Sequence, residues 1–388
     1  MTASLPKVSV HPKGVGRLRA GHPWVYRTDL ESTGGLDAGL VELYDERSKP
    51  LGTALFSPAS EIRVRWLAPP GERVDAEWWT QRMRRALERR AGIPDSAFRV
   101  VHAEGDGLPS LVVDRYGDWA VAQLLSAGLE SVRGHVLDAI RTVLAPKGLL
   151  LRNDAAVREH ERLPRGVELA FGEVPEQIEY TEGTLRLVAA PWTGQKTGAF
   201  LDQRENHQLV GRLARGRCLD VFCHHGGFAL QMATAGSPDV LAIDSSAEAL
   251  RVCGRSAERN GLSVRVEEAN AFDWLRAAAH GPDRYEAIVL DPPAFAKDRR
   301  SLPRALAGYK ELNLRAMKLL AGGGWLFTAS CSYHVHRGDF FAMLGDAAAD
   351  SGRRLQLVEI RGAAADHPEV VTVPETGYLK AALLRAID

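Results

Sequence analysis

The stretch CLDVFCHHGGF, residues 218–228, decides the fold class of this chain. It reads as an apolar strand that ends in an acid, Asp220, followed by a Gly226-Gly227 turn and the start of a helix. Glycines in such a turn let the backbone approach a ligand closely. The same rhythm recurs after residue 191, with strands expected at 217–222, 240–243, 264–267, 287–290 and 325–329. This alternation predicts an α/β fold, in which helices cover both faces of a parallel sheet.

The second of these strands indicates the kind of ligand. Residues 240–246 read VLAIDSS, so Asp244 and Ser245 stand at the carboxyl end of the strand. An acid at that position can hydrogen-bond both hydroxyls of a ribose. The pattern G-x-G-x-x-G, which binds the pyrophosphate of a dinucleotide, is absent. We therefore expect a nucleoside ligand without a pyrophosphate, and S-adenosylmethionine fits better than a nicotinamide cofactor.

Two further strand ends carry candidate chemistry. Asp291 follows the strand 287–290 and precedes Pro292-Pro293, so we expect it where ligands bind in open α/β sheets. An ordinary turn is the alternative reading of this Asp-Pro pair. Cys331 stands just past the strand 325–329, and we expect its thiol in the same crevice. A buried inert cysteine would more naturally lie inside the strand, so the position favours a nucleophile.

The first 190 residues have a different organisation. Short apolar runs alternate with Gly and Pro clusters over the first 70 residues, which is typical of a small β-barrel. Residues 71–190 read as a compact α+β unit, with helices expected at 75–91 and 131–144 and a hairpin around Glu182-Gly183. We therefore expect three domains, at 1–70, 71–190 and 191–388.

Composition excludes several classes of protein. The 388 residues are 45% hydrophobic and 25% charged, as in ordinary folded domains, which excludes wholesale disorder. The longest apolar runs fall far short of a membrane span, and no secretory signal is recognisable at the N-terminus. The four cysteines have no paired spacing, which favours a reducing compartment, and three of them, Cys218, Cys223 and Cys253, read as buried apolar residues. We expect a cytoplasmic protein that does not contact a membrane.

The N-terminal segment is locally basic, although Lys+Arg 49 balance Asp+Glu 49 over the whole chain. Five basic residues precede the first carboxylate, Asp29: Lys7, Lys13, Arg17, Arg19 and Arg27. Basic side chains bind nucleic acid chiefly through its phosphates. We expect residues 1 to about 70 to bind RNA.

Taken together, the motifs resemble the bacterial large-subunit (23S) ribosomal RNA cytosine-C5 methyltransferase family. The resemblance covers essentially the whole chain and rests on KGVGRLRAGHPWVY (13–26), HAEGDGLPSLVVDRYGD (102–118), GQKTGAFLDQREN (194–206), DVFCHHGGF (220–228), DPPAFAK (291–297), SCS (330–332), DHP (366–368) and PETGYLK (374–380). The family joins an N-terminal PUA domain, a central α+β domain and a Rossmann-like class I methyltransferase domain. The resemblance implies the same architecture here.

The resemblance also implies a site for S-adenosylmethionine. The residues that it implies are Lys196, Thr197, Gly198, Phe200, Asp202, Gln203 and Arg204 over the methionine end; Asp220, Phe222 and Gly226 around the amino acid moiety; Asp244 and Ser245 at the ribose; Asn270, Ala271 and Phe272 at the adenine; and Asp291 and Pro292. An Asp is common in the family where Asn270 stands, and an amide can still form one hydrogen bond to an adenine edge.

The family's reaction explains the two candidate catalytic residues. Cytosine C5 is a poor nucleophile, and a thiolate that adds at C6 turns the ring into an enamine that attacks the sulfonium methyl group. Cys331 would be this thiolate, and Asp291 would hold the proton at N3. Many RNA cytosine methyltransferases carry a second cysteine after the proline of the Asp-Pro loop, where Ala294 stands here. The base that removes the C5 proton is left open.

Two other functions stay open at this point. Asp291-Pro292-Pro293 with Phe295 loosely resembles the loop that holds an exocyclic amine in adenine-N6 methyltransferases, whose chemistry needs no cysteine. A non-catalytic RNA-binding assembly factor could also retain a cofactor fold. The oligomeric state is open as well, and a homodimer is one of the alternatives.

The remaining motif-bearing loops give weaker signals. His224-His225 and His334-x-His336 invite a metal hypothesis, but no carboxylate or cysteine spacing completes a recognisable site, so we expect no metal. Lys297, Arg299 and Arg300 suit phosphate contacts beside a flipped base, with an ordinary exposed loop as the alternative.

Overall fold

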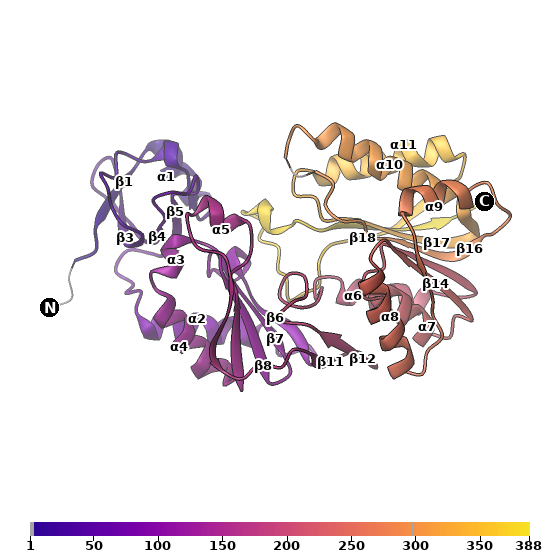
Figure 1. Ribbon diagram of the computed structural model, residues 1–388. Coiled ribbons are helices and arrows are strands. Elements are labelled where there is room, and N and C mark those ends of the chain that lie inside the picture. Colours follow the sequence, from indigo (N-terminus) through magenta and orange to yellow (C-terminus); the bar gives the residue numbers. More distant parts are fainter. Residues whose placement is uncertain (1–3, 297) are drawn as a thin grey trace. The chain divides into compact units, whose positions relative to one another are not determined.

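The computed structural model describes residues 4–296 and 298–388, which form two compact units (Figure 1). The first unit contains the N-terminal part up to Thr181, with Val188–Leu201 and Asp366–Thr376. The second contains Glu182–Leu187, Asp202–Ala365 and Gly377–Asp388. The structure does not test the domain boundaries near residues 70 and 190, which stay predictions.

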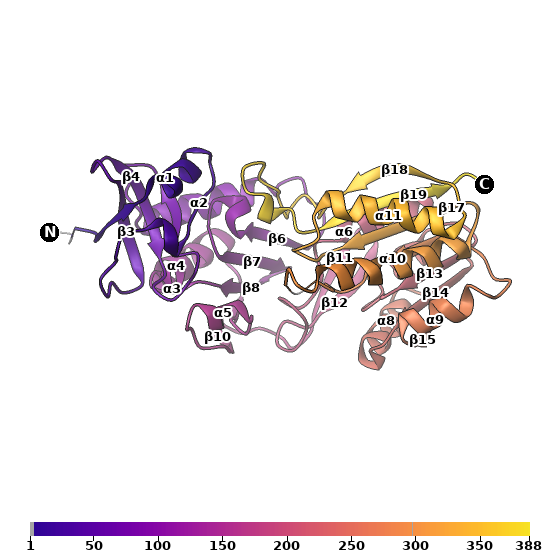
Figure 2. The same cartoon turned by 90° about the horizontal axis from the view of Figure 1, so that it is seen from above.

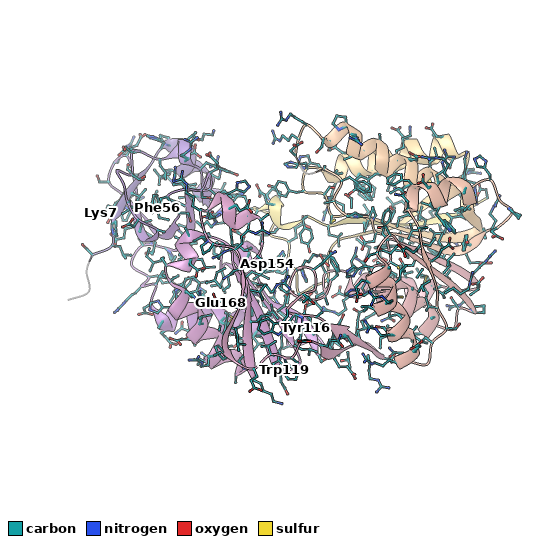
Figure 3. The ribbon with its side chains drawn as sticks, viewed as in Figure 1. Lys7, Phe56, Tyr116, Trp119, Asp154 and Glu168 are labelled. Atoms are coloured by element: carbon teal, nitrogen blue, oxygen red, sulfur yellow. The ribbon has the colours of Figure 1, made fainter. Side chains whose placement is uncertain are left out.

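The N-terminal part of the first unit is a sheet with strand order β1-β3-β4-β5-β2. Its elements are β1 Lys7–Val10, α1 Pro12–Arg19, β2 Trp24–Val25, β3 Gly39–Asp45, β4 Pro50–Phe56 and β5 Val64–Ala68, with a short 3-10 helix at Arg27–Asp29. Leu43 and Phe56, the latter labelled in Figure 3, are fully buried in its core. Helix α1 was not predicted from the sequence, because two glycines interrupt its short pattern.

The basic residues of this segment largely have partners within the same unit. Arg17 forms a 2.6 Å ion pair with Asp29, Arg19 lies 3.8 Å from Asp45, and Arg27 lies 3.2 Å from Glu61. The run of positive charge is therefore reduced by carboxylates that come later in the sequence. Lys7 and Lys13 are exposed.

The rest of the first unit is built on a second sheet, with strand order β10-β9-β8-β7-β6. Its elements are α2 Ala76–Glu88, β6 Ala97–His102, β7 Leu111–Tyr116, β8 Trp119–Leu124, α3 Ala127–Glu130, α4 Arg133–Leu144, β9 Gly148–Arg152, α5 Val157–His160 and β10 Val167–Gly172, with a 3-10 helix at Ala103–Asp106. Asp75 caps α2 by accepting the Trp78 N–H, and Trp79 and Met83 of this helix are fully buried. A hairpin of β11 Ile178–Glu182 and β12 Leu185–Ala189 follows.

The described residues of the second unit form a seven-stranded sheet with strand order β15-β14-β13-β16-β17-β19-β18. The strands are β13 Arg217–Val221, β14 Asp239–Asp244, β15 Arg265–Glu268, β16 Tyr285–Leu290, β17 Leu320–Ser330, β18 Leu355–Arg361 and β19 Lys380–Ala386. The strands from β15 to β17 pair in parallel, whereas β19 pairs antiparallel with both of its neighbours. The parallel part matches the predicted strands, and the antiparallel pair β18 and β19 was not predicted.

Helices cover both faces of this sheet, as Figures 1 and 2 show. They are α6 Arg204–Leu213, α7 Gly227–Thr234 and α8 Ala247–Arg259 on one face, and α9 Ala271–Ala278, α10 Leu302–Leu319 and α11 Arg337–Ser351 on the other. Alternate residues of β16 enter the two cores: Ile288 and Leu290 face α9 to α11, and Ala287 and Val289 face α6 to α8. Burial on both faces explains the uninterrupted apolar run in the sequence. The predicted α/β fold is confirmed.

Candidate active site

Three acidic residues of the second unit stand at neighbouring strand ends. Asp220 lies near the end of β13, Asp244 ends β14, and Asp291 follows β16. Val221 of β13 is in register with Ile243 of β14 and with Leu290 of β16, so all three strands end at one edge of the sheet. The strand order reverses between β13 and β16, and ligands of open α/β sheets bind outside the carboxyl ends of the strands at such a point.

The turn between β13 and α7 is tightly constrained. Phe222 and His224 have positive φ angles of 66° and 48°, and Gly226 has a φ of 84°. Non-glycine residues in this region cost about 1–3 kcal/mol each and cluster at ligand-binding turns. A Cβ on Gly226 would overlap the Sγ atom of Cys253, so only glycine fits there. The geometry is that of a turn shaped for a ligand.

Asp244 is oriented by two backbone groups. Its Oδ2 accepts the His224 N–H at 2.9 Å, and its Oδ1 accepts the Ser246 N–H at 2.9 Å. Each carboxylate oxygen can accept a further hydrogen bond. The side chain is partly exposed, and Ser245 beside it is exposed. The carboxylate is thus fixed in place while it can still accept bonds from a ribose.

Two buried polar atoms indicate the chemistry of a ligand that would fit this site. Asp220 is fully buried; its Oδ2 accepts the Ala229 N–H at 2.9 Å, while Oδ1 has no hydrogen-bond partner among the described residues. Gln203 is 3% exposed, and its Nε2 likewise has no partner in the described part of the chain. Such atoms cost about 1–3 kcal/mol each when left unsatisfied. An acceptor and a donor of this kind match the ammonium and carboxylate groups of an amino acid.

Burial also alters the titration of Asp220. It raises the pKa of this carboxyl to about 7, with a smaller increase from Asp291, while the Ala229 N–H and His207 act in the opposite direction. A positive ligand group beside the carboxyl would favour its ionised form. The site therefore suits a cationic group at this position.

The His207 ring packs against Gly227 of the glycine turn. This residue was not predicted from the sequence. Its Nδ1 lies 2.8 Å from Oε1 of Glu182, and its ring packs edge-on against Phe228, with 4.5 Å between ring centroids. Burial opposes the charge of His207, but Glu182 outweighs this effect and raises the pKa of the imidazole. No local signal marks His207, because Glu182 is 25 positions away in the sequence.

The predicted adenine residues lie at the start of α9. The Asn270 side chain caps the helix, since its Oδ1 accepts the backbone N–H groups of Phe272 and Asp273 at 3.0 and 3.3 Å. Ala271 is buried. The Phe272 ring lies 5.9 Å from that of Phe295, which extends the apolar surface. The Asn270 oxygen is thus engaged in the cap, and its amide N–H groups are the ones suited to a ligand.

Cys331 follows the last residue of β17 and lies beside the loop of residues 291–296, called here the Asp-Pro loop. Its Sγ is 3.9 Å from the carbonyl oxygen of Pro292, which is buried. Cys331 is partly exposed, whereas Cys218, Cys223 and Cys253 are buried, as predicted. Ser332 joins the two loops, because its Oγ accepts the Ala296 N–H at 3.2 Å. The structure thus brings the thiol and the Asp-Pro loop together.

The predicted segment 196–204 is divided between the two units. Lys196, Thr197, Gly198 and Phe200 belong to the first unit, and Asp202, Gln203 and Arg204 are buried in the second. Thr197 donates a 2.5 Å hydrogen bond to Asp114 of β7 and lies 3.2 Å from the hydroxyl of Tyr116, which Figure 3 labels. Lys196 has a positive φ of 53°. The assignment of the first four residues to the cofactor site stays a prediction.

The weaker signals have simple structural outcomes. Among the residues that the structure describes, no group of three or more His, Cys, Asp or Glu side chains is placed to hold a metal ion. The rings of His224 and His225 stack at 3.7 Å, and burial together with His224 lowers the pKa of His225 to about 3. Arg299 and Arg300 are exposed, and Lys297 lies outside the described residues.

Comparisons with known proteins agree with this geometry. Residues 98–385 match the S-adenosylmethionine-dependent methyltransferase family, and residues 8–69 match a PUA-like domain. The chain is therefore an S-adenosylmethionine-dependent methyltransferase with a PUA-like domain near its N-terminus, which confirms the expected enzyme class and cofactor.

The names of similar proteins specify the kind of methyltransferase. Proteins named ribosomal RNA large subunit methyltransferase I are 36% identical in Aeromonas hydrophila, with 100% of both chains covered, and 37% identical in Tolumonas auensis, with 94% of this chain and 96% of the relative covered. The relative from Klebsiella pneumoniae is 35% identical, with 98% of each chain covered. The chain belongs to the ribosomal RNA large subunit methyltransferase I family.

Solved structures share the whole fold. A protein assigned as a methyltransferase and crystallised with S-adenosylhomocysteine aligns with a TM-score of 0.85 at 19% identity, covering 98% of this chain and 100% of that chain. A Streptococcus mutans protein assigned as an S-adenosylmethionine-dependent methyltransferase gives a TM-score of 0.83 at the same identity and coverage. At this identity the likeness concerns the fold alone. No helix in the described part of the chain is long and apolar enough to span a membrane.

Proposed function

We propose that the protein forms 5-methylcytosine in large-subunit ribosomal RNA, with S-adenosylmethionine as methyl donor and Cys331 as the nucleophile. The relatives at 34–37% identity are named for the large-subunit ribosomal RNA. With this substrate, the proposed site of the reaction is the cytoplasm. The choice of cytosine C5 rests on the site of this chain.

The observation that carries the proposal is the position of one thiol. Of the four cysteines, Cys331 alone is partly exposed, and its Sγ lies 3.9 Å from the carbonyl of Pro292 in the Asp-Pro loop. Methylation of an exocyclic amine requires no thiol, because the amine nitrogen is itself nucleophilic. A thiol beside the loop that would hold the base supports C5 chemistry instead.

The reaction balances without further reagents. The Cys331 thiolate forms a bond to C6, the C5=C6 electron pair shifts to form C4=C5, and the C4=N3 electron pair takes up at N3 the proton that Asp291 holds. S-adenosylmethionine supplies a methyl group on a positively charged sulfur. C5 takes that methyl group as its bond to the sulfonium sulfur breaks, with the electron pair left on the sulfur of S-adenosylhomocysteine. The C5 proton then leaves to a base, the S–C6 bond breaks to restore the C5=C6 double bond and release the thiolate, and N3 returns its proton to Asp291.

The polar groups of the second unit would orient the cofactor. Asp220 accepts from its ammonium group, and Gln203 donates to its carboxylate. These bonds satisfy the two buried atoms that have no partner among the described residues. Asp244 accepts from the ribose hydroxyls. Phe272 provides apolar surface for the adenine, and Phe222 lies beside the amino acid moiety. Lys196, Thr197, Gly198 and Phe200 remain part of this proposal through the family resemblance.

The RNA would reach the thiol across exposed side chains of two loops. Tyr333 is 52% exposed and follows Cys331 by two positions, and Arg299 and Arg300 are exposed beyond the Asp-Pro loop. Aromatic rings stack on unpaired bases, and guanidinium groups bind phosphates. This arrangement supports a target base that is turned out of its helix.

The product of the reaction tests the proposal. Ribosomal RNA from cells lacking the protein is incubated with the purified enzyme and S-adenosylmethionine, digested to nucleosides and analysed by mass spectrometry. We expect 5-methylcytidine with the wild-type enzyme and none with Cys331→Ala. N6-methyladenosine as the product would favour the alternative, and no methylated product at all would favour a non-catalytic assembly factor.

A further inference from the structure

A buried lysine, Lys380, contacts the backbone on both sides of Cys331. Lys380 opens β19 and is in register with Ser330, the last residue of β17. Lys380 is 3% exposed, and its Nζ donates to the carbonyl oxygens of Ser332 at 2.6 Å and Tyr378 at 2.7 Å. Lysine is rarely buried to this extent without an anionic partner, because removing the ammonium group from water is costly. This position therefore requires an explanation.

We propose that Lys380 is a positioning residue that fixes the backbone around Cys331 and stabilises its thiolate. The inference rests on the proposed function, since it takes Cys331 to be the nucleophile. Lys380, the first residue of β19, would thus act on the reactivity of Cys331, which follows β17.

The hydrogen bonds fix the nucleophile from both sides along the chain. Ser330, before Cys331, is held by strand pairing with Lys380, and Ser332, after it, is held by Nζ. Ser332 also lies 2.9 Å from the hydroxyl of Tyr309 on α10. The residue between them has little freedom to move, which is the condition for a preorganised nucleophile.

The positive charge of Lys380 would also favour the thiolate form of Cys331. Burial lowers the pKa of Lys380 to about 8 and Arg337 of α11 lowers it too, while Cys331 raises it. The ammonium form therefore predominates at pH 7. Electrostatic coupling is reciprocal, so a thiolate that favours the ammonium is itself favoured by it.

Other charged groups lie near Lys380 or next to the contacts of Cys331. Arg337 is close enough to lower the pKa of Lys380, and Asp291 directly precedes Pro292, whose carbonyl oxygen lies 3.9 Å from the Cys331 Sγ. The Tyr309 phenol stays neutral near pH 7, because burial raises its pKa. Lys380 is the group of this set that combines positive charge with a direct hydrogen bond to the backbone beside Cys331, at the Ser332 carbonyl.

Alkylation measures the thiolate without RNA or cofactor. The full-length protein is treated with iodoacetamide between about pH 6 and 10, and the modified Cys331 peptide is quantified by mass spectrometry, because only the thiolate reacts. We expect Lys380→Met to raise the midpoint by about one pH unit, a tenfold loss of thiolate worth about 1.4 kcal/mol. Lys380→Arg should keep the wild-type midpoint.

Two further variants separate charge from packing. Lys380→Gln keeps a neutral donor for the Ser332 carbonyl, and we expect it to raise the midpoint as Lys380→Met does, so it carries the test if the Met variant does not fold. Lys310→Met removes a lysine that is paired with Asp350, and it should leave the midpoint unchanged. An unchanged midpoint in folded Lys380→Gln or Lys380→Met would overturn the inference.

Alkylation and product analysis together distinguish a failure of this inference from a failure of the proposed function. A raised midpoint together with the absence of 5-methylcytidine would support the role of Lys380 and reject the cytosine-C5 assignment. Normal 5-methylcytidine formation by the wild-type enzyme, with an unchanged midpoint in the variants, would support the cytosine-C5 assignment and reject the role of Lys380.

Discussion

Gly227 lies directly against the imidazole of His207: a Cβ on Gly227 would come within 2.6 Å of Nε2. Gly227 opens α7 at the glycine turn, and His207 sits on α6 in a buried pair with Glu182. The glycine turn therefore rests on a buried, hydrogen-bonded side chain. Its shape depends on a contact between residues 20 positions apart in the sequence.

Gly227→Ala should displace the turn and weaken S-adenosylmethionine binding at least about tenfold, because the added methyl group overlaps the His207 ring. Isothermal titration calorimetry measures the affinity. Gly254→Ala is the matched control: Gly254 is on α8, no atom lies within 4 Å of an added Cβ, and alanine favours a helix. Equal affinities of Gly227→Ala and wild type would show that the turn does not define the site.

Asp244→Ala should also weaken cofactor binding about tenfold or more, about 1.4 kcal/mol, the scale of a lost hydrogen bond to a charged group. The same calorimetric titration applies, with circular dichroism to verify folding, since the variant also loses the carboxylate that accepts from His224 and Ser246. Unchanged affinity in the folded variant would remove Asp244 from the ribose site.

Asp220 should make stability depend on pH in the absence of cofactor. Burial raises its folded pKa to about 7, above the ordinary value of 3.8, so the folded state binds more protons between these values. The free energy of unfolding therefore falls as pH rises from about 4 to 7. Asp220→Asn removes this contribution. The free energy of unfolding in urea should therefore fall less from about pH 4 to 7 in the variant than in the wild type, and the two falls should differ by at least about 1 kcal/mol. Parallel curves for the two proteins would argue against a raised pKa.

Lys13→Glu should weaken RNA binding and reduce its dependence on salt, since each phosphate contact contributes about one to the slope of log affinity against log salt. Lys13 is exposed, whereas Arg17 is paired with Asp29. Arg17→Ala serves as the comparison and should mainly lower stability. Filter binding of a ribosomal RNA fragment at several salt concentrations measures both effects. An unaltered slope in Lys13→Glu would exclude this residue from the RNA surface.

The central parallel strands were predictable because burial on both faces makes them continuous apolar runs, as in β16, whereas the edge strand β15 is exposed. Asp291 and Cys331 were placed from the sequence because each follows such a run directly. The roles of His207 and Lys380 could not be predicted in this way. Glu182 precedes His207 by 25 positions and Ser332 precedes Lys380 by 48, and only the folded sheet brings each pair together. The ion pairs of Arg17 with Asp29 and of Arg27 with Glu61 could not be predicted either, because folding brings these partners together.

The most direct test of the account is a covalent trap at Cys331. RNA that carries 5-fluorocytosine at the target should hold the enzyme after methyl transfer, because fluorine at C5 cannot leave as a proton. We predict a complex that survives denaturing electrophoresis, requires S-adenosylmethionine and is absent in Cys331→Ser, whose hydroxyl is far less ionised than a thiol. Cys218→Ala, Cys223→Ala and Cys253→Ala should each retain it, apart from stability losses. An adduct through another cysteine, or full methylation by Cys331→Ala, would contradict the account.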